Sequence, residues 1–571
     1  MFTLERESLA ELIASKFDEF KGYRSKREEE WEELRRYLFA TSTKDTTNNQ
    51  LPWRNSTTRP KLTQIRDNLH ANYMAAEFSS EDWLEFMPGD EESSSRDKVK
   101  AAERYIYSKT MQVDFESHVS QALLDWIDYG VVFGGLEWVR DTYKDAQGED
   151  VTKYVGCKPF RISPMDIVFD PTLEDFKSAP KIIRKVKSLG TLILEAQTKP
   201  DMSYVLEHLD KIKAARGVKY DLRKNRGFEV DGFGNIQNYM DSGVVEILEY
   251  VGDLYDATTG EVMQNRVITV IDRAHVVRNE PLQSWNGSSY LYFSGWRKRP
   301  DNLWSMGCLD NLVGMQYRID HLENLKADVF DMIAHPITVE KGDLEFAGFY
   351  PGARAYLSDE AELGILKIDS QALNADIQIA TLEQSMEEMA GAPKQAMGLR
   401  TPGEKTAFEV NSLDAAANRV FLNKVSQFEK EYLEPMLNDW LEMSRRMLDG
   451  VDVIKSFDDD LGIESFIEIT KDDLTSKGKI RARGARHLAY RNQRVQELAT
   501  FNNSVLQDPG IRAHISSKRI AKIFAELLGD DQMFGENVQV IEQLETQKAQ
   551  QMAQMQLEED TRAASQIQEV S

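Results

Sequence analysis

The sequence predicts an α-rich α+β protein. Apolar residues recur at the three- and four-residue spacing of amphipathic helices in three long stretches, residues 4–38, 305–333 and 409–448. Apolar and polar residues alternate in shorter stretches, as expected for strands, at residues 131–140, 154–162, 244–250 and 267–271. A chain of 571 residues, 41% hydrophobic and 29% charged, has the composition of a folded globular protein. Its length predicts about two to four domains.

Residues 1–304 are expected to form an α+β body. After the first helix, helical patterns recur at residues 60–78, 94–106 and 118–130, and Gly130 should end the last of these helices. A hairpin should follow, turning at the polar cluster 144–150, and a second hairpin should turn within residues 253–262.

The middle of the chain predicts two helices on either side of a small β-containing segment. The first helix is expected over residues 305–336, where Pro336 stops it. Residues 337–370 hold strand-like pieces separated by Gly and Pro, and residues 371–391 are helical again. Elements in this order make an elbow with the β segment at its tip.

The remainder begins with a Pro- and Gly-punctuated loop over residues 392–408. Residues 409–470 should combine a long helix, kinked at Pro435, with a hairpin around residues 458–460. Residues 471–571 are expected to be helical in pieces and to end in a Gln- and Glu-rich helix or a tail.

The acidic composition argues against a sequence-reading DNA-binding protein. The net charge is −25 and the sequence pI about 4.9, whereas such proteins are usually basic because Lys and Arg displace counterions from phosphates. The two cysteines, Cys157 and Cys308, cannot form a disulfide framework in a chain of this size. The eight histidines are scattered without metal-ligand spacing. We therefore expect no bound metal. No apolar run reaches the ~18 residues of a membrane span, so we expect no membrane segment either.

The sequence contains no recognisable catalytic set. Gly398 and Gly403 have the spacing of a phosphate-binding P-loop, but Glu404 stands where the motif requires Lys, and Lys405 follows one residue late. The segment also follows a helical pattern and not a strand. Because no nucleophile elbow or paired Cys and His signature occurs either, we expect a protein that is not an enzyme and that has no cofactor.

Two groups of basic residues are the candidate sites. The loop 392–408 carries Lys394, Arg400 and Lys405. The second group lies between Asp473 and Glu497, where no acidic residue occurs. Its members are Lys477, Lys479, Arg481, Arg483, Arg486, Arg491 and Arg494. In so acidic a chain, pairing with acidic neighbours within or between subunits is the preferred interpretation of this group, and phosphate contact is the alternative.

Two further clusters have alternative interpretations. Aromatic residues gather near Arg297, Lys298 and Arg299, where they would either stack on single-stranded bases or form a subunit interface. They are Trp285, Tyr290, Tyr292, Phe293, Trp296 and Trp304. Acidic residues gather around Pro171, where turn and cap chemistry is favoured over a cation site because the spacing of a calcium loop is missing. They are Asp166, Asp170, Glu174 and Asp175.

Three stretches carry a family resemblance. The first is Gly-Leu-Arg-Thr-Pro-Gly-Glu-Lys-Thr-Ala-Phe-Glu-Val at 398–410, and the second is Ile-Ser-Pro-Met-Asp-Ile-Val-Phe-Asp-Pro at 162–171, with an acidic and then basic run to Lys187. The third is Trp-Ser-Met-Gly at 304–307, which leads into a helix with Gln316, Asn324 and Asp328 and then into residues 334–339. In this order, the three stretches resemble the portal proteins (head-to-tail connectors) of tailed bacteriophages, especially of short-tailed phages.

The resemblance implies a fold and an assembly. The fold would have a wing (1–304 and 409–470), a two-helix stem (305–336 and 371–391), a β-containing clip (337–370), a channel loop (392–408) and a helical crown (471–571). The assembly would be a ring, most often a dodecamer, at one vertex of the capsid, through which double-stranded DNA is packaged and ejected. An acidic channel would let DNA slide, which agrees with the charge of this chain.

The resemblance also implies partners and a location. The partners would be further copies of the chain, the major capsid protein and scaffold, the terminase large subunit, the tail adaptor protein, and double-stranded DNA bound non-specifically and transiently. The protein would be found in the virion, and in the host cytoplasm during assembly, with ATP hydrolysis left to the terminase. The alternatives are a helical structural adaptor or scaffold of another large assembly, and an undetected nucleic-acid enzyme.

Overall fold

The computed structural model describes a set of segments separated by gaps. They are residues 2–4, 8–39, 55, 57–78, 83–89, 96–144, 150–198, 205, 244–282, 289–334, 338–341, 344–346, 355–357, 362–365, 374–391, 420–448, 450–458, 463–471, 473–474 and 477–482. The chain divides into two compact units, Met1–Gly450 with Thr470–Ala485, and Val451–Ile469 with Arg486–Ser571. No division falls at residue 304, so the first unit includes both the body and the two-helix elbow.

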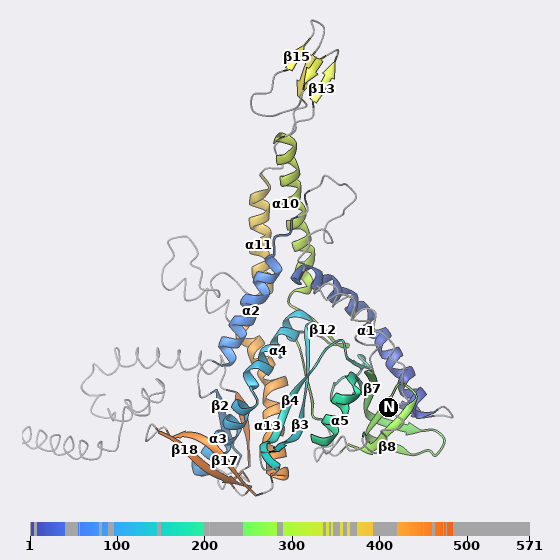
Figure 1. Cartoon of the computed structure of the whole chain (residues 1–571), viewed down its shortest axis with the longest axis vertical. Helices are drawn as coiled ribbons and strands as arrows, with labels where there is room; N and C mark the ends of the chain where they lie inside the picture. The colour runs from blue at the N-terminus through green and yellow to red at the C-terminus, as the bar shows by residue number, and fades with distance from the viewer. Residues whose placement is uncertain are drawn as a thin grey trace, which may run out of the picture. The chain divides into compact units, whose positions relative to one another are not determined.

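The first unit is α+β, as the sequence predicts (Figure 1). Its largest sheet has the strand order β5-β6-β7-β8-β9, with each pair antiparallel, and β1 joins β7 in parallel. The strands are β1 (Phe2–Leu4), β5 (Ile167–Phe169), β6 (Lys181–Ser188), β7 (Val244–Asp256), β8 (Val262–Ile271) and β9 (His275–Pro281). The predicted hairpin turn within residues 253–262 is confirmed as the connection between β7 and β8.

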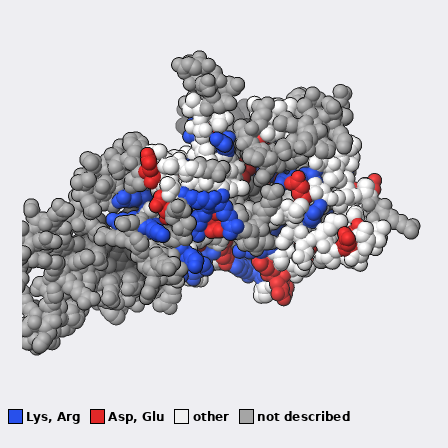
Figure 2. Space-filling view, turned by 90° about the horizontal axis from the view of Figure 1, so that it is seen from below, with Lys and Arg blue, Asp and Glu red and all other residues white. Residues whose placement is uncertain are grey.

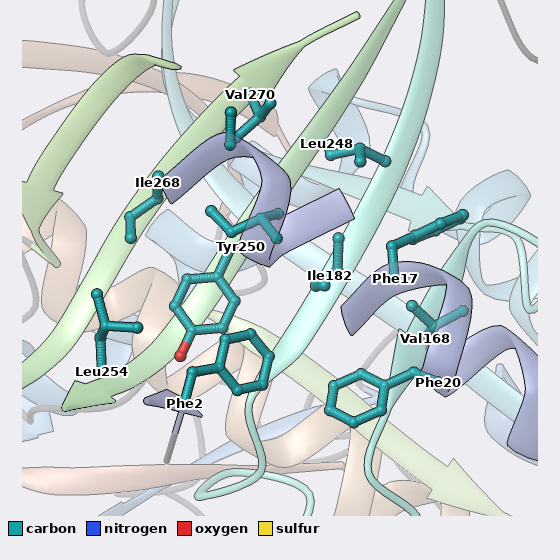
Figure 3. Packing of buried hydrophobic residues seen from close by; sticks show 12 residues of the cluster. Phe2, Phe17, Phe20, Val168, Ile182, Leu248, Tyr250, Leu254, Ile268 and Val270 are labelled. Carbon is teal, nitrogen blue, oxygen red and sulfur yellow. The ribbon is translucent and has the colours of Figure 1, made fainter. Parts of the chain in front are cut away.

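Helix α1 (Leu9–Phe39) covers part of this sheet. Its buried apolar side chains, Ala10, Ile13, Phe17 and Phe20, recur every three or four residues and so form one face. In Figure 3 that face meets Phe2 of β1 and Tyr250 of β7, whose rings stack with their centroids 4.6 Å apart. Burying a Phe side chain contributes about 1.5–3 kcal/mol, so this core ties the first residues of the chain to the sheet.

A second sheet has the order β10-β3-β4, with β3 (Val131–Lys144), β4 (Asp150–Ile162) and β10 (Leu291–Gly295). The predicted β3–β4 hairpin is confirmed, and its register runs from Phe133 opposite Ile162 to Lys144 opposite Asp150. Residues of both sheets share an aromatic core with α1. It contains Trp31, Phe133, Phe169, Phe176 and Trp304.

Helices α2 (Lys61–Glu77), α3 (Arg96–Gln112), α4 (Phe115–Asp128) and α13 (Glu434–Met447) complete the body. Helix α4 packs on β3 and β4, and α2 packs on α4. The expected disruption near Pro435 takes the form of a π-helical turn, Glu429–Leu433, in which the N–H of Glu434 bonds to the carbonyl of Glu429. Because Pro435 has no N–H to donate, the ladder is already irregular where the wider turn occurs.

The predicted helix–β–helix order of the elbow is present, with different bounds. The first helix, α10 (Val313–Ala334), begins later than residue 305 because Asn302–Met306 forms β12, which pairs with β11 (Arg297–Arg299), and Asp310–Leu312 is a 3-10 turn. The second helix, α11, spans Asp376–Ala390. Between them, β13 (Thr338–Lys341) pairs with β16 (Glu362–Ile365) and β14 (Leu344–Phe346) with β15 (Ala355–Leu357), so one hairpin is nested in the other.

The expectation of a helical segment from residue 471 is wrong at its start. Residues Gly478–Ala482 form strand β19, antiparallel to β2 (Leu84–Pro88). The physical reason is visible in the pattern Lys-Ile-Arg, which alternates polar and apolar residues and buries only Ile480. In the second unit, the predicted hairpin is confirmed as β17 (Val451–Asp458) paired with β18 (Ile463–Thr470).

Candidate functional site

The predicted channel loop lies outside the described residues, and so do Lys394, Arg400 and Lys405. Its two flanks are described. Helix α11 ends at Gly391, whose φ of 73° is the left-handed conformation of a glycine C-cap. The chain is helical again from Val420. A helix therefore precedes the loop directly, as the sequence predicts, and the start of the helix expected from residue 409 lies outside the described residues.

Helices α10 and α11 run antiparallel, side by side (Figure 1). Lys326 of α10 pairs with Asp376, the first residue of α11, at 2.7 Å. We call these two helices, with the strands β13–β16 between them, the arm. Its second helix carries Asp376, Glu383, Glu387 and Glu388 and no basic residue, although Asp376 is paired with Lys326 and Glu387 is buried.

An extended segment preceding α2 lies along α10. This segment, residues 55 and 57–60, is called the strap together with the first two residues of α2, Lys61 and Leu62. Four buried polar side chains of α10 bind its backbone: Gln316, Asp320, Asn324 and Asp328. Asp328 accepts from the N–H of Asn55 (2.7 Å), Asn324 from Thr57 (2.7 Å), Asp320 from Arg59 (3.0 Å) and Gln316 from Leu62 (3.2 Å).

The spacing of this ladder follows from the geometry of a helix and an extended chain. Residues four apart on a helix are separated by about 6 Å along its axis, and residues two apart in an extended chain by about 6.6 Å. The two spacings therefore match, so that each of Asp328, Asn324 and Asp320 lies opposite one residue of the strap. These residues are Asn55, Thr57 and Arg59, in that order. The ladder satisfies the N–H groups of a segment that belongs to no sheet.

The strap also binds α11. Arg59 pairs with Glu383 at 2.9 Å, and Lys61 pairs with Glu387 at 2.5 Å, with both members of the second pair buried. Because α10 binds the strap backbone and α11 binds its side chains, the strap holds the two helices of the arm together. The sequence reasoning missed it, although the four-residue spacing of the polar residues Gln316, Asp320, Asn324 and Asp328 along one face of the helix was a signal.

Burial raises the pKa of one ladder residue. Desolvation raises the pKa of Asp320 to about 6, although hydrogen bonds from the Arg59 N–H and from Gln316 favour the carboxylate. The Gln316 Nε2 donates to Asp320 Oδ1 at 2.9 Å and to the Arg59 carbonyl at 2.6 Å. Asp320 Oδ2 is buried and has no hydrogen-bond partner among the described residues.

The stretch 162–171 has a structural role in the described part of the chain. The buried Arg24 donates to the carbonyls of Pro164 (2.9 Å) and Ile167 (2.5 Å) and pairs with Glu28 at 2.7 Å. Asp170 accepts from the N–H and hydroxyl of Thr172, which is the turn chemistry expected around Pro171.

Neither interpretation of the aromatic cluster fits three of its described rings. Trp296 and Trp304 are 5% and 1% exposed, and Tyr292 is 3% exposed. Trp304 stacks on Phe169 with the ring centroids 4.5 Å apart. Since these rings pack inside the body, they are not available for stacking on bases or for a subunit interface. Trp285 lies outside the described residues.

The two basic groups are only partly described. Of the second group, Lys477, Lys479 and Arg481 lie at or on β19, and Lys479 and Arg481 are exposed. Arg483, Arg486, Arg491 and Arg494 lie outside the described residues. No ion pair among the described residues involves Lys479 or Arg481, so pairing with acidic neighbours within or between subunits stays a prediction for this group.

A cavity of about 480 Å³ lies beside β10 and the π-helical turn, lined by side chains of both charges. Lys298 crosses it to bond Glu431 at 2.5 Å. The basic residues of its lining are Lys177, Lys298, Arg299 and Lys430, and the acidic residues are Glu174, Asp175 and Glu431. This balance of charge selects no single class of ligand.

No helix among the described residues is long and apolar enough to cross a membrane. A comparison of the sequence with protein-family models gives no match, and a search of curated proteins gives none that is significant.

Proposed function

We propose that this chain is the subunit of a ring-shaped portal, a dodecamer by its resemblance to that family, at one vertex of a phage capsid. Double-stranded DNA would pass through the ring during packaging and ejection. The observation that carries the proposal is the arm, an antiparallel helix pair with nested β-hairpins between its helices and a basic loop directly after α11. This is the order of stem, clip and channel loop that the sequence resemblance implies.

The mechanism is geometric and electrostatic. Channel-lining helices with a surplus of acidic residues would repel phosphates, so such a channel would let DNA slide without holding it. The loops 392–408 would project inward, and Lys394, Arg400 and Lys405 would touch phosphates. Each contact must stay weak, because several tight phosphate contacts would make binding steep in salt and stall transport.

The remaining parts would serve as docking surfaces. The segment 337–370 would bind the terminase large subunit and later the tail adaptor protein, and the body and the C-terminal residues would contact the major capsid protein and scaffold. ATP hydrolysis belongs to the terminase in this scheme, so the chain needs no cofactor of its own. It would be located in the virion, after assembly in the host cytoplasm.

Electron microscopy of the purified chain tests the assembly. Closed rings with a central hole wide enough for duplex DNA are expected in views down the ring axis. A filament or a globular dimer would instead favour a structural adaptor of another assembly. Turnover that depends on ATP or a metal ion would favour an enzyme.

Charge reversal of the loop tests the channel. The variant Arg400→Glu/Lys405→Glu should still form rings but package DNA poorly. The matched control is Lys26→Glu/Arg297→Glu, which reverses two exposed cations elsewhere in the chain and should package as the parent does. Normal packaging by the loop variant would show that the loop does not contact DNA.

A further inference from the structure

The β2–β19 pair presents a basic face to solvent. Lys479 and Arg481 project from one face of β19, opposite Met87 and Glu85 of β2, because alternate residues of a strand point the same way. Ile480 projects from the other face and is 1% exposed. The strand is anchored by Asn438 of α13, which accepts from the Ile480 N–H (2.8 Å) and donates to its carbonyl (3.0 Å). The two basic side chains are therefore held outward by a rigid backbone.

Other cations lie near the chain that leads into this strand, and one of them, Arg445, also pairs with Glu442 at 3.1 Å. Arg445 of α13 donates to the carbonyl of Leu474 at 2.5 Å, and Lys471 donates to the carbonyl of Arg446 at 2.9 Å. Lys98 of α3 is close enough to help lower the pKa of Asp473. Helices α3 and α13 and strand β2 lie toward the lower end of the view in Figure 1, and Figure 2, seen from below, shows Lys and Arg side chains gathered on that side.

We infer that the exposed face of β19 binds the phosphate backbone of duplex DNA without reading its sequence. Lys479 and Arg481 are about 6.6 Å apart along the strand, and neither has an ion-pair partner among the described residues. Lys and Arg side chains at this spacing neutralise neighbouring phosphates and release their counterions.

A protein partner fits this face less well. Protein interfaces are depleted in Lys and enriched in aromatic residues, whereas the face shows Glu85, Met87, Lys479 and Arg481 and no aromatic side chain. An acidic surface of a second copy would match its charge but would lack an apolar anchor here. The surface extends the proposed function to a DNA contact outside the loop 392–408, and it does not depend on ring formation.

The test measures how DNA binding by the full chain depends on salt. The probe is a fluorescent duplex of about 30 base pairs, titrated by anisotropy between about 50 and 200 mM NaCl, and each lost phosphate contact reduces the slope of log K against log salt by about 0.9. The variant Lys479→Gln/Arg481→Gln should reduce the slope by about 1.8 and weaken binding at 50 mM salt by at least about tenfold. The charge-preserving swap Lys479→Arg/Arg481→Lys should bind as the parent does, and so should the remote control Lys26→Gln/Arg297→Gln.

Other outcomes would overturn the inference. An unchanged slope in the Gln variant, or no binding by the parent chain at 50 mM salt, would show that the face does not contact DNA. Loss of rings with DNA binding intact would assign it to contact between subunits. Circular dichroism of each variant shows that it is folded. If the parent chain forms rings but binds no DNA at this face, the inference is refuted and the proposed function stands. If the chain binds DNA at this face but forms no rings, the inference stands and the proposed function is refuted.

Discussion

Asn324 of α10 binds the backbone of Thr57 with both atoms of its amide. Its Oδ1 accepts from the Thr57 N–H at 2.7 Å and from the hydroxyl at 2.8 Å, and its Nδ2 donates to the Thr57 carbonyl at 3.1 Å. An amide side chain carries both a donor and an acceptor, so it can pair with a backbone as a neighbouring strand would. This side chain belongs to the ladder of contacts that sets the register of the strap on the arm.

Replacing Asn324 by Ala should loosen the strap. The Thr57 N–H and carbonyl would lose their partners in a partly buried site, at a cost of about 1–3 kcal/mol for each buried group left unsatisfied. We expect faster hydrogen exchange across α10 and residues 57–62. The matched control is His321→Ala, which truncates an exposed side chain on the same helix and should leave exchange unchanged. Equal hydrogen-exchange rates in the two variants would contradict the role of Asn324 in holding the strap on α10.

Removing one partner of the Lys61–Glu387 pair should destabilise the arm strongly. The two side chains are 9% and 4% exposed, and an unpaired charge left in such a site costs about 3–5 kcal/mol. Lys61→Met or Glu387→Met alone should therefore lower the free energy of unfolding by about this amount, measured with urea. The double variant should recover much of the loss, because no buried charge is left over.

The exposed pair Lys326–Asp376 is the control for that cycle. Its side chains are 25% and 63% exposed, and ion pairs at the surface contribute only about 0.2–1 kcal/mol. Asp376→Asn should therefore have a small effect. If the Lys326–Asp376 and Lys61–Glu387 variants lowered the free energy of unfolding equally, the burial of the Lys61–Glu387 pair would be contradicted.

The pH dependence of stability should carry a contribution from Asp320. Its pKa is raised from the ordinary 3.8 to about 6 in the folded state, so between these values the folded chain binds more protons than the unfolded chain. The contribution of Asp320 to the free energy of unfolding is greatest below pH 3.8, and it is lost as the pH rises through 6.

The Asp320→Asn variant isolates that contribution. It keeps an oxygen to accept from the Arg59 N–H but does not ionise, so at pH 7 it should be more stable than the parent by on the order of 1 kcal/mol, with the difference vanishing near pH 4. The difference between variant and parent is the quantity to follow by thermal denaturation, since burial also raises the pKa of Asp125 to about 6 and lowers that of His118 to about 4. A difference that does not change with pH would refute the prediction.

Replacing Gly130 should disrupt the junction between α4 and β3. Its φ is 74°, and a Cβ there would lie 2.3 Å from the Gly307 nitrogen. Both the left-handed backbone and the backbone contact disfavour any side chain. Gly130→Ala should lower the melting temperature by several degrees. Gly22→Ala on α1, where a Cβ would meet nothing within 4 Å, should be neutral or stabilising.

Much of the architecture could be predicted because it depends on local patterns. The apolar spacing of Phe17, Phe20 and Trp31 predicts α1, and the alternation in residues 131–140 predicts β3. The helices expected from residue 305 and from residue 471 were both predicted wrongly at their first residues, and for the same reason. Residues 302–306 and 478–482 are short strands, and a short strand depends on a partner that local sequence does not specify.

The sequence by itself determined the α+β class, the order of helix, hairpins and helix in the arm, and the positions of the basic residues, because periodicity and composition are read from neighbouring residues. Only the tertiary structure decided what the polar side chains of α10 bind, since Asn324 and Thr57 are 267 residues apart. The spacing of buried side chains can be read from the sequence, but the element that covers them cannot. Likewise, Lys479 and Arg481 form an outward face only because β2 and Asn438 hold β19 in place.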